Sequence, residues 1–162
     1  RRTQGGNNNA YCHDDESNWF DWSLVEKHAD AHRFVTLLAA RRLLRDVEHE
    51  QRRVSLTQLI AGADKSWHGM KLGQPDSGEH SHSIAFTARM RSEPITVHLI
   101  LNAFWESLEF ELPPIVGTWQ RWIDTSLPAP EDIVEWQKAP ASHGSTYRAG
   151  PRSVAVLYAV SG

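Results

Sequence analysis

The chain has 162 residues and a formal net charge of −3, and it contains no apolar run long enough to cross a membrane as a helix. Its length suits one domain, or one small domain and a piece of another. The charge balance gives no electrostatic reason to expect a nucleic acid or an anionic membrane as a partner. The single cysteine, Cys12, cannot form an internal disulfide, so we expect a reducing, cytoplasmic compartment.

The first stretch, residues 2–22, is a polar loop that ends in aromatic residues. Its asparagines, Asn7, Asn8 and Asn9, supply amide donors and carbonyl acceptors, and Tyr11 supplies a flat apolar face. Amides and aromatic rings together suit a sugar, which has many hydroxyls and one apolar face per ring. These four side chains are therefore candidates for sugar binding. The alternative is a plain surface loop, because Asn and Gly are common turn formers.

A long amphipathic helix is predicted over residues 23–53, where no Gly or Pro interrupts the sequence. Ser23 and Glu26 have the spacing of a capping box at its start. Apolar residues recur at helical spacing and charged residues occupy the opposite side, so the helix must dock on another surface. The apolar positions include Val25, Val35 and Leu38.

An all-β unit is predicted over residues 66–162, after a linker with a short helix over residues 54–65. Alternating apolar residues and turn-forming residues place strands at 82–90, 95–102, 108–112, 118–124 and 153–160. The last of these is almost wholly apolar, so we expect it to be central to a sheet or buried on both faces. Five or six antiparallel strands with short connections indicate a β-sandwich, and the whole chain is α+β.

Residues 1–53 combine a loop with a one-sided helix, and such a segment does not enclose a core by itself. The β unit of roughly a hundred residues could fold alone. We therefore expect residues 1–53 to be the end of a larger domain.

Two groups of side chains are candidates for chemistry. Asp14-Asp15-Glu16 is a run of three carboxylates, but a retaining glycosidase needs two carboxyls on opposite sides of the scissile bond, which sequence neighbours rarely achieve. We expect a solvated acidic turn.

His80 and His82 form the best metal candidate, because two histidines at i and i+2 on a strand point to one face. A third ligand would come from Glu93 or His98, as in a metal-dependent enzyme of the cupin type. An exposed junction between a loop and a strand explains the pair as well, and we expect no metal and no cofactor.

The opening stretch RTQGGNNNAYCHDDESNWFDWSLVEKHAD resembles the segment near the end of the catalytic barrel in glycogen debranching enzymes of the isoamylase type, in the α-amylase superfamily. Later motifs are similar to the C-terminal domain of the same enzymes, in the same order and over nearly the whole chain. These motifs are SWHG at 66–69, QPD at 74–76, SHSIAF at 81–86, LNAFWE at 101–106, WIDT at 122–125 and SVAVL at 153–157.

This resemblance implies that residues 1–53 are the last loop and last helix of a (β/α)8 barrel, and that residues 66–162 are a C-terminal β-sandwich. The parent enzyme would hydrolyse α-1,6 branch linkages in glycogen or limit dextrins, with retention. Its nucleophile, general acid and stabilising carboxylate would come from earlier barrel strands, so no catalytic residue is expected in this segment, which should be inactive alone. Asn7, Asn8, Asn9 and Tyr11 would lie near the bound glucan.

The alternative function is a non-catalytic β-sandwich that binds glucan or braces the barrel. Seven tryptophans favour glucan binding, because tryptophan faces stack on sugars. However, Trp105, Trp119 and Trp122 occur in strand-like contexts and are predicted to lie in the core, where they could not act as stacking platforms.

Overall fold

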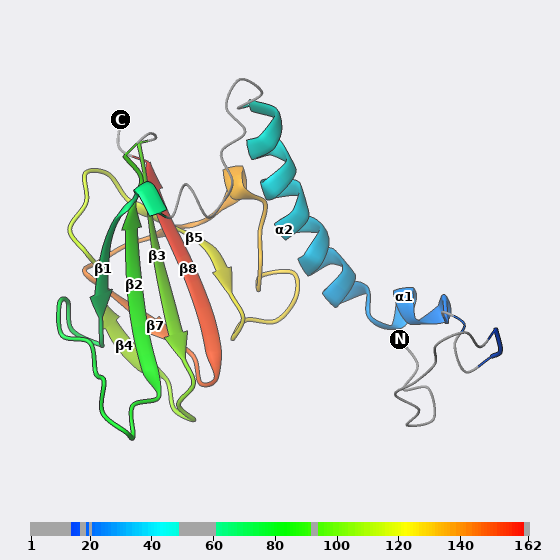
Figure 1. Ribbon diagram of the computed structural model, residues 1–162, viewed down its shortest axis with the longest axis horizontal. Coiled ribbons are helices and arrows are strands. Elements are labelled where there is room, and N and C mark those ends of the chain that lie inside the picture. Colours follow the sequence, from blue (N-terminus) through cyan, green and yellow to red (C-terminus); the bar gives the residue numbers. More distant parts are fainter. Residues whose placement is uncertain (1–13, 17–18, 20, 49–60, 92–93, 161–162) are drawn as a thin grey trace. The chain divides into compact units, whose positions relative to one another are not determined.

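The computed structural model describes residues 14–16, 19, 21–48, 61–91 and 94–160. The chain is divided between two compact units, residues 1–36 and residues 37–162. The described α-helices precede the strands along the sequence (Figure 1). Within the described ranges, every helix is too short or too polar to cross a lipid bilayer.

The predicted single helix is two helices, α1 (Ser23–Lys27) and α2 (Ala29–Glu48). They are separated at His28, whose backbone leaves the helical region at φ −117° and ψ 39°. Histidine is a modest helix former, and the apolar spacing around it gave no sign of the break. The end of the predicted long helix, residues 49–53, lies outside the described residues. So does most of the predicted linker with its short helix, of which the structure describes only residues 61–65.

The start of α1 is stabilised by Asp21 and not by the predicted capping box. Oδ1 of Asp21 accepts hydrogen bonds from the amide of Ser23 at 3.2 Å and from its hydroxyl at 2.6 Å. Ser23 is therefore the first helical residue, and Trp22 occupies the N-cap position without a side-chain bond. The helix therefore begins at the first residue of the predicted range, but Ser23 is not its N-cap.

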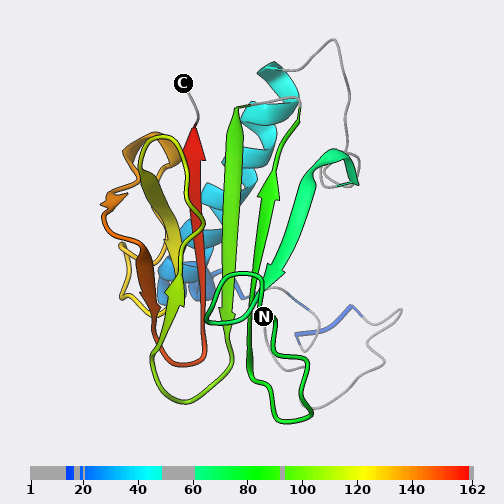
Figure 2. The same cartoon turned by 90° about the vertical axis from the view of Figure 1, so that its left-hand side faces the viewer.

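The strands form two antiparallel sheets in the described part of the chain (Figures 1 and 2). The larger sheet has six strands in the order β1-β2-β3-β8-β5-β6, and the smaller pairs β4 with β7. A short 3-10 helix, η2 (Trp136–Lys138), follows β5. The strands are β1 (Asp64–His68), β2 (Ser83–Arg89), β3 (Ile95–Asn102), β4 (Leu108–Glu111), β5 (Trp119–Asp124), β6 (Ala141–Ser142), β7 (Thr146–Ala149) and β8 (Ser153–Val160).

The two strands richest in apolar residues match their predictions. β3 and β8 begin and end where the sequence placed them. β8 lies between β3 and β5, so its central position is confirmed. β1, β6 and β7 were not predicted as strands, because β1 is polar and β6 and β7 have only two and four residues.

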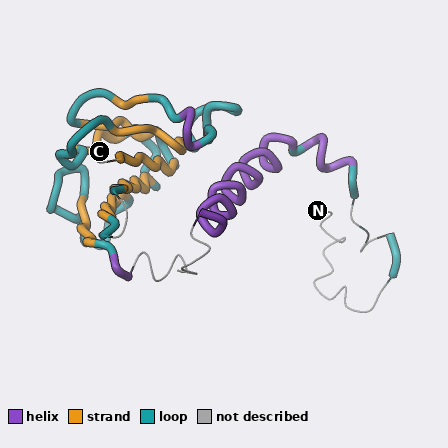
Figure 3. Tube along the Cα trace, turned by 90° about the horizontal axis from the view of Figure 1, so that it is seen from above, coloured by secondary structure: helices purple, strands orange, loops and turns teal. Residues whose placement is uncertain are grey.

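The hydrophobic core lies between the two sheets. Ile100 and Leu157 enter it from the six-stranded sheet, and Phe110 and Ala149 enter it from the two-stranded sheet. All four side chains are fully buried. The strands therefore pack face to face, as in a β-sandwich, with the connecting loops at the edges (Figure 3).

Candidate functional site

The six-stranded sheet is apolar on the face that points away from the core. Successive residues of a strand point to opposite faces, so the chain neighbours of the core residues Ala85, Ile100 and Ala155 point outward. We call this surface the outer face. In register across β1, β2, β3 and β8, it comprises Trp67, Ile84, Phe86, Val97, Leu99, Leu101, Val154, Val156 and Tyr158.

The outer face is covered at one side and open at the other. The ring of Trp136, from η2, stacks on Tyr158 with centroids 3.6 Å apart, and the Tyr158 hydroxyl donates to the Trp136 carbonyl at 2.5 Å. Toward β1, Trp67 packs on Phe86 with centroids 4.7 Å apart and remains 54% exposed. A sheet that is apolar on both faces is typical of one that is buried on both faces.

The helices also carry exposed apolar side chains. Val25 of α1 and Val35 of α2 are exposed, and so is Leu38 at the start of the second unit. The predicted apolar side of this helical segment is therefore not enclosed in a core among the described residues.

The predicted sugar-binding residues Asn7, Asn8, Asn9 and Tyr11 lie outside the described residues. The acidic run that follows them, residues 14–16, is exposed, as expected for a solvated turn. Oδ1 of its first residue, Asp14, accepts a hydrogen bond from the indole nitrogen of Trp19 at 2.6 Å.

The histidine pair that was considered as a metal site is not on a strand. β2 begins at Ser83, so His80 and His82 lie in the preceding loop and do not share a sheet face. Of the two suggested third ligands, Glu93 is outside the described residues and His98 is fully buried on β3. Within the described ranges, no three His, Cys, Asp or Glu side chains are grouped closely enough to hold a metal ion.

A chain of hydrogen bonds joins two buried histidines on the inner side of the sheet. Nδ1 of His68 accepts from the Gly73 amide at 2.8 Å, so its Nε2 carries the proton in the neutral ring. That Nε2 lies 2.9 Å from the Thr87 hydroxyl, which in turn lies 2.8 Å from Nδ1 of His98. The Nε2 proton of His68 is shared between the Thr87 hydroxyl and the Ser66 hydroxyl, which lies 3.0 Å away, and the Thr87 hydroxyl donates to His98. This order leaves the Nε2 proton of His98 without a partner.

Burial keeps both rings neutral. Desolvation, followed by the nearby His68, lowers the pKa of His98 to about 4. Desolvation also lowers the pKa of His68. The two side chains therefore hold strands β1, β2 and β3 together and are not placed to bind a ligand. Sequence spacing could not reveal this network, because the partners meet only through the strand register.

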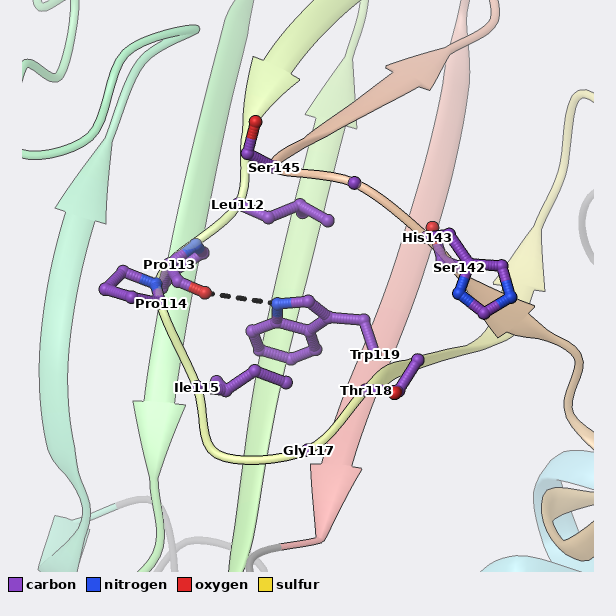
Figure 4. Close-up of a pocket in the computed structure, with 11 residues that line it drawn as sticks. Leu112, Pro113, Pro114, Ile115, Gly117, Thr118, Trp119, Ser142, His143 and Ser145 are labelled. Carbon is purple, nitrogen blue, oxygen red and sulfur yellow. Dashed lines mark hydrogen bonds between the residues drawn. The ribbon is translucent and has the colours of Figure 1, made fainter.

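A pocket of about 520 Å³ lies between the β4–β5 loop and the β6–β7 loop (Figure 4). Trp119 forms its floor, is 3% exposed, and donates its indole N–H to the Pro113 carbonyl at 3.1 Å. The indole face is therefore not free to stack on a sugar. The described lining residues include no carboxylate, so this pocket lacks the groups for glycoside hydrolysis. They are Leu112, Pro113, Pro114, Ile115, Gly117, Thr118, Trp119, Ser142, His143, Gly144 and Ser145.

The three tryptophans predicted to be core residues differ in the structure. Trp119 is buried, as expected, and Trp122 is half-buried. Trp105 is 62% exposed, so its prediction is wrong. The reason is local: β3 ends at Asn102, and Trp105 lies in the loop that follows.

Comparison with known proteins identifies the family of this chain. The family model described as Isoamylase 1-3, C-terminal, matches residues 66–158. The chain is 35% identical over 140 residues to the chloroplastic isoamylase SU1 of Zea mays, which covers 82% of this chain and 16% of the maize protein. It is 30% identical over 162 residues to the chloroplastic isoamylase 3 of Oryza sativa subsp. japonica, covering 97% of this chain and 19% of the rice protein.

A short segment of the chain shows a higher sequence identity to a bacterial protein. Over 29 residues, which are 18% of this chain and 4% of the relative, the chain is 69% identical to the glycogen operon protein GlgX homolog of Mycobacterium tuberculosis. The chain spans less than a fifth of the length of each of these curated relatives.

Proposed function

Because the chain belongs to the isoamylase family and carries its C-terminal domain at residues 66–158, we propose that it is part of a debranching enzyme. This enzyme hydrolyses α-1,6-glucosidic branch linkages in glycogen or limit dextrins. The isoamylases of maize and rice and the bacterial glycogen operon protein support the proposal, since the chain is similar to all of them.

Hydrolysis with retention needs two carboxyl groups about 5 Å apart on either side of the scissile bond. These groups come from a catalytic (β/α)8 barrel, of which residues 1–53 are the last loop and helix. Asn7, Asn8, Asn9 and Tyr11 lie on a loop at the catalytic face and contact the glucan, since loops after barrel strands build such sites.

The β-sandwich braces this barrel through its outer face. The observation that carries this role is that an exposed apolar row, Trp67 and Leu101 among its members, lies on the side of the sheet opposite the core. Burying a large apolar side chain contributes about 1.5–3 kcal/mol. A few such residues packed on the barrel stabilise the enzyme without touching the substrate.

A chimeric enzyme tests the brace. The part of maize isoamylase SU1 that precedes its own C-terminal β-sandwich is joined to residues 61–162 of this chain, and soluble debranching activity on a limit dextrin is measured. We expect the chimera to be active and the maize part alone to be insoluble or inactive. Equal activity of the maize part with and without the sandwich would contradict the role. The 162-residue chain alone should release no reducing ends.

A further inference from the structure

An aromatic cluster lies in the loop that joins β3 to β4. Trp105 stacks on Phe104 with ring centroids 4.2 Å apart and planes 29° apart. The ring of His82 lies 6.2 Å from that of Phe104 and 6.3 Å from that of Trp105. Phe104 is half-buried, whereas Trp105 is 62% exposed. The indole is therefore supported by two other rings while much of its surface faces solvent.

Hydrogen bonds to a buried side chain fix the backbone of this loop. Asn102 is 1% exposed; its Oδ1 accepts from the Phe104 amide at 3.1 Å, and its Nδ2 donates to the Glu106 carbonyl at 2.9 Å. The Phe104 carbonyl also accepts from the Arg152 amide at 2.9 Å. Trp105 thus lies between two anchored residues, so its ring is held in place before any ligand arrives.

The surroundings of Trp105 differ from those of the other exposed tryptophan of the sandwich. Trp67 lies on the outer face beside Phe86, among apolar residues that suit a protein contact. Two exposed, charged residues are near Trp105. Glu106 follows it in the chain, and the amide of Arg152 donates to the carbonyl of the preceding residue, Phe104. An exposed ring with charged residues next to it in the chain and across a backbone hydrogen bond suits a ligand with one apolar side and polar edges.

We propose that Trp105 is a stacking platform for the glucose units of an α-glucan chain, at a site outside the catalytic barrel. The C–H face of a pyranose ring packs on the exposed indole, and its hydroxyls reach the charged neighbours Glu106 and Arg152. Phe104 and His82 are positioning residues that keep the indole in the open. The choice of an α-glucan rests on the proposed function, whereas the platform itself rests on the geometry.

Affinity electrophoresis of the 162-residue chain in gels that contain glycogen tests the platform. We expect the wild-type chain to be retarded relative to a gel without glycogen, and Trp105→Ala to bind about tenfold more weakly. Trp67→Ala is the matched control, because it removes an exposed tryptophan from the outer face, and it should be retarded like the wild type. Trp105→Phe keeps an aromatic face and should fall between the two.

An unretarded wild-type chain, or a Trp105→Ala chain retarded as strongly as the wild type, would overturn the platform. A measurement on the wild type alone avoids any effect of a variant on folding: addition of maltoheptaose should shift the indole N–H resonance of Trp105 and not that of Trp67. The reverse pattern overturns the proposal.

Assay of the natural polypeptide on a limit dextrin separates this proposal from the proposed function. Active debranching together with an unretarded chain overturns the platform alone, and retardation without debranching overturns the enzyme assignment alone.

Discussion

The phenol of Tyr147, on β7 of the small sheet, donates a 2.6 Å hydrogen bond to Oδ2 of Asp124, on β5 of the large sheet. Oδ1 of the same carboxylate accepts from the amide of Ser126 at 2.9 Å and from its hydroxyl at 2.6 Å. Burial, together with the bond to Asp124, raises the pKa of Tyr147 above its ordinary value, so the phenol stays protonated as a donor. This contact joins the two layers of the sandwich by a polar bond in addition to the core.

Replacing Tyr147 by Phe should destabilise the sandwich by about 1.5–3 kcal/mol, because it leaves a carboxylate oxygen of the 3% exposed Asp124 without its donor. Urea unfolding monitored by tryptophan fluorescence measures the change. Tyr158→Phe is the matched control: it removes a phenol that donates to a neutral carbonyl, and should cost about 0.5–1.5 kcal/mol. Equal stability of the Tyr147 variant and the wild type would contradict the proposed tie.

The free energy of unfolding should fall on acidification, because His98 is neutral in the folded chain and takes up a proton more readily when unfolded. Its pKa is about 4 in the folded chain and is about 6.5 when unfolded, so the unfolded state binds the proton first. The stabilisation is fully present above pH 6.5 and is lost as the pH falls toward 4. Between pH 7.5 and pH 5 the loss from this group should be about 2 kcal/mol.

The variant His98→Phe removes this titration and should flatten the pH dependence of the free energy of unfolding between pH 7.5 and pH 5. It should also lower stability at pH 7.5, because the Thr87 hydroxyl loses its acceptor. His143→Gln replaces an exposed histidine as the control. The same pH slope in His98→Phe and in the wild type would show that this histidine is not responsible.

Two neighbouring residues of β3 distinguish the outer face from the core. Leu99→Lys places a charge on the outer face, so in the chimera it should abolish soluble debranching activity while the isolated chain still unfolds cooperatively. Ile100→Ala opens a cavity at a fully buried position and should destabilise the isolated chain by about 2–5 kcal/mol. Full activity of the Leu99→Lys chimera would contradict the brace.

Asn102→Asp should loosen the loop that presents Trp105. The new oxygen would face the carbonyls of Glu106 and Gly150, which Nδ2 of Asn102 now reaches at 2.9 Å and 2.8 Å. Losing two hydrogen bonds to part-buried carbonyls should cost about 3 kcal/mol in thermal or urea unfolding. Retardation by glycogen should weaken as well. Unchanged stability would show that the loop is held by other contacts.

The sequence was most informative where apolar residues form long runs. The limits of β3 and β8 were predicted because such runs fit only the middle of a sheet. β1 escaped prediction because the residues Asp64–His68 are mostly polar and exposed and belong to an edge strand. The register that brings Thr87 beside His98 is set by pairing between strands and could not be read from spacing along the chain.

The candidate site was only partly predictable. The alternation of Ile84 and Phe86 on one side of β2 was recognised, but that side proved to be the outer face, and Ala85 points into the core. Trp105 was assigned to the core because apolar residues surround it in the sequence. The turn after Asn102 that exposes its ring depends on hydrogen bonds from residues almost fifty positions away.

Assay of the natural polypeptide that contains this chain is the most direct test of the enzyme assignment. An antibody raised against residues 61–162 captures that polypeptide from the cells that make it, and the captured material is incubated with a glycogen limit dextrin. We predict that branches are removed and that linear chains with new reducing ends are released. A captured, folded polypeptide that leaves every α-1,6 linkage intact would contradict the account.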